Sequence, residues 1–199
     1  GRTMISKGLL DEAKKNVDYN TNLLYKYVEK DIKIVGVESS CVSAMQDEFP
    51  DLADDRSKAK EIAKNTFTIQ DLLVQIQNDG GQQIKWKSLN KDLLLFVHCH
   101  ERALDGIDNS LESLNLPDNF QAKLIDAGCC GMAGSFGMEK EHYDISKKMA
   151  NDRLIPAINN SEKNQEIIVT GISCHDQIKD LSNKNPKYLI EVLAEAIDS

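Results

Sequence analysis

The 199-residue sequence lacks the long apolar runs of membrane-spanning proteins and the basic excess of nucleic-acid-binding proteins. Its longest purely apolar run is LLLFV at residues 93–97, far short of the ~20 residues that a membrane-spanning helix needs. The formal net charge is −8, and lysine and arginine do not cluster along the chain. These absences argue against a transmembrane segment and against nucleic acid as the main partner.

The sequence also lacks an even set of cysteines and a recognisable secretory signal. It has five cysteines, and its first residues, GRTMISKGLLDEAKK, are typical of an amphipathic helix. An odd number of thiols without a secretory signal favours a reducing compartment, and metal or redox chemistry rather than a disulfide framework. We therefore expect a cytoplasmic protein, with the inner face of the membrane as an alternative location.

What the sequence does contain is an alternation of apolar strands with helical patterns. Helical spacing of apolar residues predicts long helices over residues 5–29 and 138–159, with Pro156 kinking or ending the second, and a last helix that begins at Pro186. Such alternation predicts an α/β fold, a mostly parallel sheet with helices on both faces. The predicted strands are residues 32–38, 92–98, 122–128 and 166–172.

Every cysteine follows one of these predicted strands. The carboxyl ends of parallel strands meet at one edge of a sheet, so thiols far apart in the sequence can converge there. The glycines around the adjacent cysteines would let the backbone wrap tightly and aim N–H groups inward. We therefore predict one metal centre at this edge. The cysteines are Cys41, Cys99, Cys129, Cys130 and Cys174, and the glycines are Gly128, Gly131, Gly134 and Gly137.

Two segments of the chain are similar to each other. Residues 131–177 align with residues 1–44 with a gap of three residues, and both begin at Gly, contain a Lys-Lys pair and close on Ser-Cys after a strand. We interpret this as an internal repeat, with a truncated first copy at residues 1–66 and a complete second copy at residues 67–199, packed as one unit. A Cys-Cys pair is then expected before Gly1, in a longer polypeptide.

Three segments resemble the cysteine-rich CCG domain: HCH at 98–100, GCCGMAGSFG at 128–137 and SCHDQI at 173–178. That domain occurs in the cysteine-rich subunit of heterodisulfide reductase, in the iron–sulfur subunits of glycolate and anaerobic glycerol-3-phosphate dehydrogenases, and in lactate-utilisation proteins. The chain is also similar to the C-terminal part of fused proteins that join an FAD-linked oxidase domain, a ferredoxin-like segment and a CCG region. Those proteins act on 2-hydroxy acids such as D-lactate, glycolate or D-2-hydroxyglutarate.

The resemblance implies an iron–sulfur electron-transfer module that passes electrons from a flavin to an acceptor. Its partners would be FAD and ferredoxin-like domains upstream in the same polypeptide. Hydroxy-acid oxidation would belong to the FAD domain, so no catalytic residue is expected in this chain, and the chain alone is expected to be inactive on substrate.

The chain departs from the family pattern at one position. The pattern ends in Cys-x-x-Cys, and Gly171 stands at the first of these positions, with Glu38 at the corresponding position of the first copy. Four thiols suffice for a four-iron, four-sulfide cluster or a tetrahedral zinc. The missing fifth thiol argues against the non-cubane cluster that cleaves disulfides. The four expected ligands are Cys99, Cys129, Cys130 and Cys174.

Two alternatives to electron transfer stay open at this point. Zinc in the same four thiols would make the domain structural, and the Cys129–Cys130 pair is suited to thiol–disulfide chemistry. Cys41 is interpreted either as a remnant ligand of the first copy or as a small buried apolar residue. The residues expected to support the ligands by contacts around them are His98, His100, Gly131 and His175.

Overall fold

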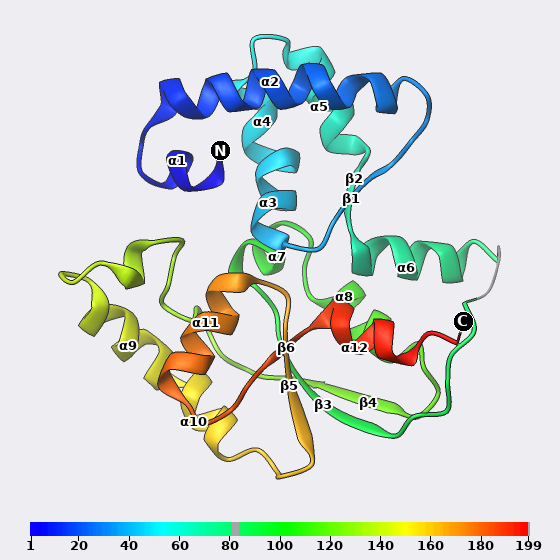
Figure 1. The fold of residues 1–199 in the computed structure, drawn as a ribbon, viewed down its shortest axis with the longest axis vertical. Helices are drawn as coiled ribbons and strands as arrows, with labels where there is room; N and C mark the ends of the chain where they lie inside the picture. The colour runs from blue at the N-terminus through cyan, green and yellow to red at the C-terminus, as the bar shows by residue number, and fades with distance from the viewer. Residues whose placement is uncertain (81–83, 199) are drawn as a thin grey trace. The chain divides into compact units, whose positions relative to one another are not determined.

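The computed structural model describes residues 1–80 and 84–198, which form two compact units (Figure 1). The first unit is Gly1–Ile69, and the second begins at Gln70. Residues 66–68 belong to the first unit because they form a strand that pairs with Ile34–Gly36. The expected division into two repeats at residue 66 stays a prediction. Each unit combines helices with parallel strands, so the predicted α/β class with parallel sheets and helices on both sides is confirmed.

The first unit holds a two-stranded parallel sheet and a group of helices. Strand β1 (Ile34–Gly36) pairs with β2 (Thr66–Thr68), a strand too short for sequence periodicity to predict. The core includes Val17, Phe49 and Ala59. The helices are α1 (Arg2–Ser6), α2 (Leu10–Val28), α3 (Ser39–Ser43), a π-helical turn (Ala44–Glu48), α4 (Phe49–Leu52) and α5 (Arg56–Lys64).

The second unit is built on a four-stranded sheet in the order β4-β3-β5-β6, with every neighbouring pair parallel. Its strands are β3 (Lys91–Phe96), β4 (Phe120–Leu124), β5 (Gln165–Val169) and β6 (Lys187–Tyr188). Its helices are α6 (Ile69–Asn78), α7 (Cys99–Leu104), α8 (Asp108–Leu114), a 3-10 turn (Phe136–Met138), α9 (Tyr143–Asp152), α10 (Leu154–Asn159), α11 (Ile172–Leu181) and α12 (Leu189–Ala196).

The central strands β3 and β5 are buried on both faces, which explains why they are continuous apolar runs rather than alternating ones. One face packs against Leu154 and Ile158 of α10 and Ile178 of α11. Helices α8 and α12 pack against the edge strands β4 and β6. The first face presents Phe96, Ile167 and Val169, and Leu93, Leu95 and Ile168 on the opposite face are fully buried.

Neither of the two predicted long helices is continuous. Residues 5–29 contain the end of α1 and all of α2, which are separated at Gly8 by a left-handed φ of 72° that favours glycine. Residues 138–159 are divided between α9 and α10 at Arg153, whose φ of −137° is not helical. Pro156 therefore lies in the first turn of α10, where its missing N–H costs no hydrogen bond.

The observed strands end earlier than the predicted ones. Residues 97 and 98 leave β3 because His98 caps the N-terminus of α7, and Gly171 similarly precedes α11. The helix expected to begin at Pro186 begins only at Leu189, because Lys187 and Tyr188 pair with β5 as β6.

Within the part of the chain that the structure describes, every helix is too short or too polar to cross a lipid bilayer.

Candidate metal centre

Four cysteines of the second unit come together at the carboxyl edge of its sheet. Cys99 is the first residue of α7 after β3, and Cys174 lies in the first turn of α11 after β5. Cys129 and Cys130 lie in the loop that follows β4. Because β4, β3 and β5 are neighbours in register, these three strand ends are adjacent. The predicted convergence of these four thiols is what the structure shows.

The four thiols contact one another in a chain. The Cys129 sulfur is hydrogen-bonded by the thiols of Cys130 and Cys99, and Cys130 also contacts Cys174. Hydrogen bonding from Cys130, and then from Cys99, holds the pKa of the Cys129 thiol well below its usual range. Hydrogen bonding to Cys129 raises the pKa values of Cys99 and Cys130. Cys129 is therefore the sulfur of the group on which hydrogen bonding most favours the thiolate, the form that binds metal.

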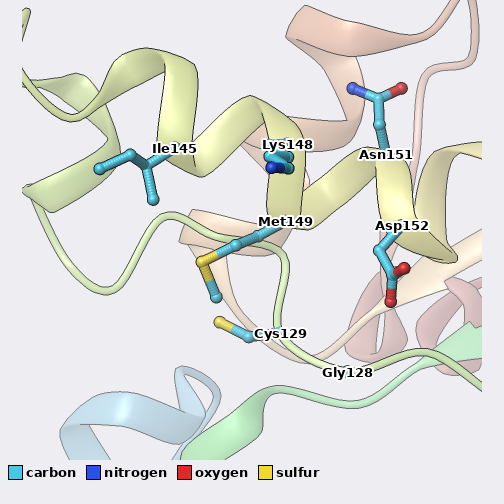
Figure 2. A pocket seen from close by; sticks show the side chains of 7 residues that line it. All are labelled: Gly128, Cys129, Ile145, Lys148, Met149, Asn151 and Asp152. Carbon is cyan, nitrogen blue, oxygen red and sulfur yellow. The ribbon is translucent and has the colours of Figure 1, made fainter.

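The site runs from the interior of the second unit to its surface. Cys130 and Cys174 are 3% and 1% exposed, whereas Cys99 and Cys129 are partly exposed. A cavity of about 610 Å³ opens beside Cys129, and the side chain of Met149 on α9 extends toward the Cys129 sulfur (Figure 2). The cavity is also lined by Gly128, Ile145, Lys148, Asn151 and Asp152. Cys129 is thus the member of the group that a solute can approach through this cavity.

His98 fills the space beside Gly171. The imidazole is 6% exposed, and a Cβ at position 171 would lie 2.5 Å from its Cδ2 atom. The His98 main-chain N–H donates to Thr170 Oγ1 at 2.9 Å, and its Nδ1 accepts from the His100 N–H at 3.3 Å. Gly171 therefore leaves room for His98, whose positive charge, when protonated, also favours the Cys129 thiolate.

The other residues predicted to surround the ligands take different places. Gly131 donates its N–H to the Cys129 sulfur at 3.3 Å, and its φ of 91° is one that favours glycine. The His100 ring lies 5.4 Å from that of His98. His175 stacks on Tyr188 at 4.9 Å and contacts Asp176 Oδ1 at 3.1 Å through Nδ1. These contacts hold His175 against β6 and its own helix.

Cys41 lies in the first unit, in the first turn of α3, and no other residue between 1 and 69 is a cysteine. Its side chain is exposed, so its interpretation as a small buried apolar residue is wrong. The other interpretation, a remnant ligand of a truncated copy, stays a prediction.

Two polar side chains that the sequence did not indicate contact the Cys129–Cys130 loop. Arg102 donates to the Ala127 carbonyl oxygen, and Gln177 donates to the Cys130 carbonyl oxygen at 2.9 Å. The one signal that could have revealed them is their spacing, since each follows a cysteine by three residues and so lies one helical turn further on.

The donors suit a cofactor that takes several sulfur ligands. Cysteine thiolates hold iron–sulfur clusters, and a main-chain N–H to a sulfur, like that of Gly131, is among the contacts that adjust a cluster's potential. Among residues 1–80 and 84–198, no three His, Cys, Asp or Glu side chains are arranged to hold one metal ion. Four thiolates are a ligand set that both a four-iron cluster and a tetrahedral zinc can take.

Comparison with known proteins finds relatives that match almost the entire chain. One subunit of anaerobic glycerol-3-phosphate dehydrogenase from Escherichia coli K12 is 24% identical over 200 residues, 99% of this chain. D-2-hydroxyglutarate dehydrogenase is 24% identical over 200 residues in Pantoea ananatis and 25% identical over 202 residues in Escherichia coli K12. The chain is homologous to both kinds of dehydrogenase. The resemblance predicted from the sequence is confirmed to that extent, although no family model matches the chain.

The dehydrogenase relatives are longer than this chain. It spans 49% of the glycerol-3-phosphate dehydrogenase subunit and 19% of the D-2-hydroxyglutarate dehydrogenases. Both names are those of dehydrogenases.

Proposed function

We propose that the second unit is an electron-transfer module that holds a four-iron, four-sulfide cluster through Cys99, Cys129, Cys130 and Cys174. The observation that carries the proposal is the convergence of four contacting thiols from three neighbouring strand ends. Four independent core cysteines would have no physical reason to gather at one sheet edge.

The module would serve a flavin-dependent dehydrogenase of 2-hydroxy acids or of glycerol-3-phosphate. Homology along 99% of the chain to dehydrogenases of glycerol-3-phosphate and D-2-hydroxyglutarate supports this class of reaction. FAD and ferredoxin-like domains of the same polypeptide would deliver the electrons, and substrate oxidation would take place on the flavin. The bound cluster would supply one-electron chemistry.

The residues of this chain have three tasks in that role. The thiolates bind the irons, and the Gly131 N–H donates a hydrogen bond to the Cys129 sulfur. Burial of Cys130 and Cys174 excludes water from one side of the site, while the cavity beside Cys129 leaves the other side accessible. A site with one buried side and one accessible side suits electron exchange with a partner, because the cluster is protected and yet close to the surface.

Anaerobic reconstitution with iron and sulfide tests the proposal. We expect about four irons and four sulfides per chain, with a visible absorption band and an electron paramagnetic resonance signal after reduction. Cys130→Ser should lose the cluster, and the matched variant Cys41→Ser should keep it, because Cys41 lies in the other unit.

Three outcomes would contradict the proposal. Stoichiometric zinc without iron would make the site structural. Redox-dependent thiol counts without metal would assign thiol–disulfide chemistry. Equal loss of iron in Cys41→Ser and Cys130→Ser would show that the ligand assignment is wrong.

A further inference from the structure

The loop that carries Cys129 and Cys130 is held at both ends by side chains from the two helices that carry the other thiols. Before the cysteine pair, the Arg102 guanidinium donates to the carbonyl oxygen of Ala127 and lies 3.5 Å from that of Gly128. At the second residue of the pair, the Gln177 amide donates to the carbonyl oxygen of Cys130 at 2.9 Å. The two donors therefore bracket the loop.

Helix geometry explains how both donors reach the loop. Arg102 follows Cys99 by three residues on α7, and Gln177 follows Cys174 by three residues on α11. Residues three apart lie on the same face of a helix, one turn apart. Each helix thus presents to the Cys129–Cys130 loop a thiol from its first turn and a hydrogen-bond donor from the next.

The Gln177 contact is part of a buried junction between three elements. Its Nε2 atom also donates to Ser146 Oγ of α9 at 2.9 Å, and Gln177, Ser146 and Cys130 are 3%, 0% and 3% exposed. Gly131 allows the close approach, since a Cβ there would lie 2.3 Å from the Ser146 carbonyl oxygen. Because no water reaches these groups, the loss of the Gln177 donor would leave buried polar atoms of the loop without partners.

We propose that Arg102 and Gln177 are positioning residues that hold the Cys129–Cys130 loop in its ligand-binding conformation before any cofactor enters. The inference deepens the proposed function and rests on it for the identity of the cofactor. Its physical basis is preorganisation: a loop already fixed by α7 and α11 needs no reordering when the thiolates bind metal. Residues that orient metal ligands typically change metal affinity by about 10–100-fold when they are removed.

The first measurement is independent of any metal. Alkylation of Cys129 in the metal-depleted 199-residue chain is followed by mass spectrometry, and the exposed Cys41 serves as internal reference. The measured quantity is the alkylation rate of Cys129 divided by that of Cys41. We expect this ratio to differ about tenfold from the wild-type ratio in Gln177→Met and in Arg102→Met. Arg102→Lys, which keeps a cationic donor, should restore part of the native rate.

Gln70→Met is the matched control. Gln70 is also 3% exposed and donates a buried hydrogen bond, but to Glu101 Oε1 at 2.9 Å rather than to the cysteine loop. Gln70→Met loses the hydrogen bond to Glu101, and Gln177→Met loses those to Cys130 and Ser146. Both variants keep a similar side-chain volume, and both should lower the midpoint of thermal unfolding. Of these two glutamine variants, only Gln177→Met should change the alkylation rate of Cys129.

The second measurement uses the reconstituted protein. A chelator should remove iron about 10–100-fold faster from Gln177→Met and Arg102→Met than from wild type or Gln70→Met. Equal alkylation rates and equal iron loss in Gln177→Met and Gln70→Met would overturn the positioning role. If the wild-type chain takes up no iron, the proposed function fails, and the alkylation rates alone decide whether these residues position the loop.

Discussion

The surroundings of Cys41 in the first unit and Cys174 in the second share a local design and differ in what the rest of each unit adds. In both, a parallel strand is followed by a cap residue and then by a helix with cysteine at its third position. Cys41 is exposed and is the one cysteine of its unit, whereas Cys174 is buried against Cys130. A strand–helix junction therefore supplies one cysteine, and a group of contacting thiols arises only where neighbouring junctions supply the others.

The N-cap residues of α3 and α11 also differ between the two units. Glu38 caps α3 with its carboxylate, which accepts from the Ser40 N–H at 3.4 Å and from Ser40 Oγ at 2.8 Å. Gly171 has no side chain to offer α11, and the space beside it belongs to His98. Helix α3 is thus stabilised by its own N-cap side chain, whereas the start of α11 leaves room for the His98 side chain. The shared order is what the predicted internal repeat would produce, and that repeat stays a prediction.

The largest difference between the two junctions should appear on removal of their thiols. Cys174→Ser should abolish most cluster binding, because it removes one of four ligands, and Cys41→Ser should leave it unchanged. Iron content after anaerobic reconstitution measures both. Similar iron loss in the two variants would mean that the two cysteines serve one centre.

The cap positions should give the next largest difference. Gly171→Ala should lower the free energy of unfolding by about 1–3 kcal/mol, the usual cost of overpacking a filled site, since its Cβ would lie 2.5 Å from His98 Cδ2. Denaturant titration measures this cost. It should shrink in a His98→Ala background, and a cost that stays the same there would rule out His98 as its source.

The smallest difference concerns how the stability contributed by one carboxyl group in each unit depends on pH, which has opposite sign in the two units. Partial desolvation, with the neighbouring charges of Asp71 and Glu101, raises the pKa of Asp105 to about 6, although the residue as a whole is exposed. Its stabilising contribution is thus complete below the unfolded pKa of 3.8 and is lost as pH rises through 6. Hydrogen bonds from Lys58 lower the pKa of Asp55 in the first unit, so its contribution is present above 3.8 and is lost only in stronger acid.

Asparagine variants separate these two cases. Asp105→Asn should stabilise the protein at pH 7.5 by less than about 1 kcal/mol, because water screens this exposed side chain, and the gain should shrink at pH 5.5. The effect of Asp55→Asn should be the same at both pH values, since Asp55 is ionised throughout. Chemical denaturation at the two pH values measures both effects, and a constant gain for Asp105→Asn would contradict the raised pKa.

The sequence predicted the presence of helices and strands better than the residues at which they begin and end. Continuous apolar runs identify β3 and β5 because strands buried on both faces need such runs. The break at Gly8 and the early end of β3 at Phe96 were not predicted, since they depend on a single backbone angle and on His98 acting as a cap. Two-residue β6 carries too few side chains to show a period at all.

The sequence by itself determined that cysteines follow strands, that glycines surround the adjacent cysteine pair and that the fold is α/β. Each of these features depends only on the local order of residues and on hydrophobic periodicity. Only the tertiary structure decided that β4, β3 and β5 are neighbours, which brings Cys99, Cys130 and Cys174 together. It also decided that Arg102 and Gln177 meet the carbonyl oxygens of the cysteine loop. The physical reason is that contacts between residues distant in the chain depend on the order of strands in the sheet, which local periodicity does not encode.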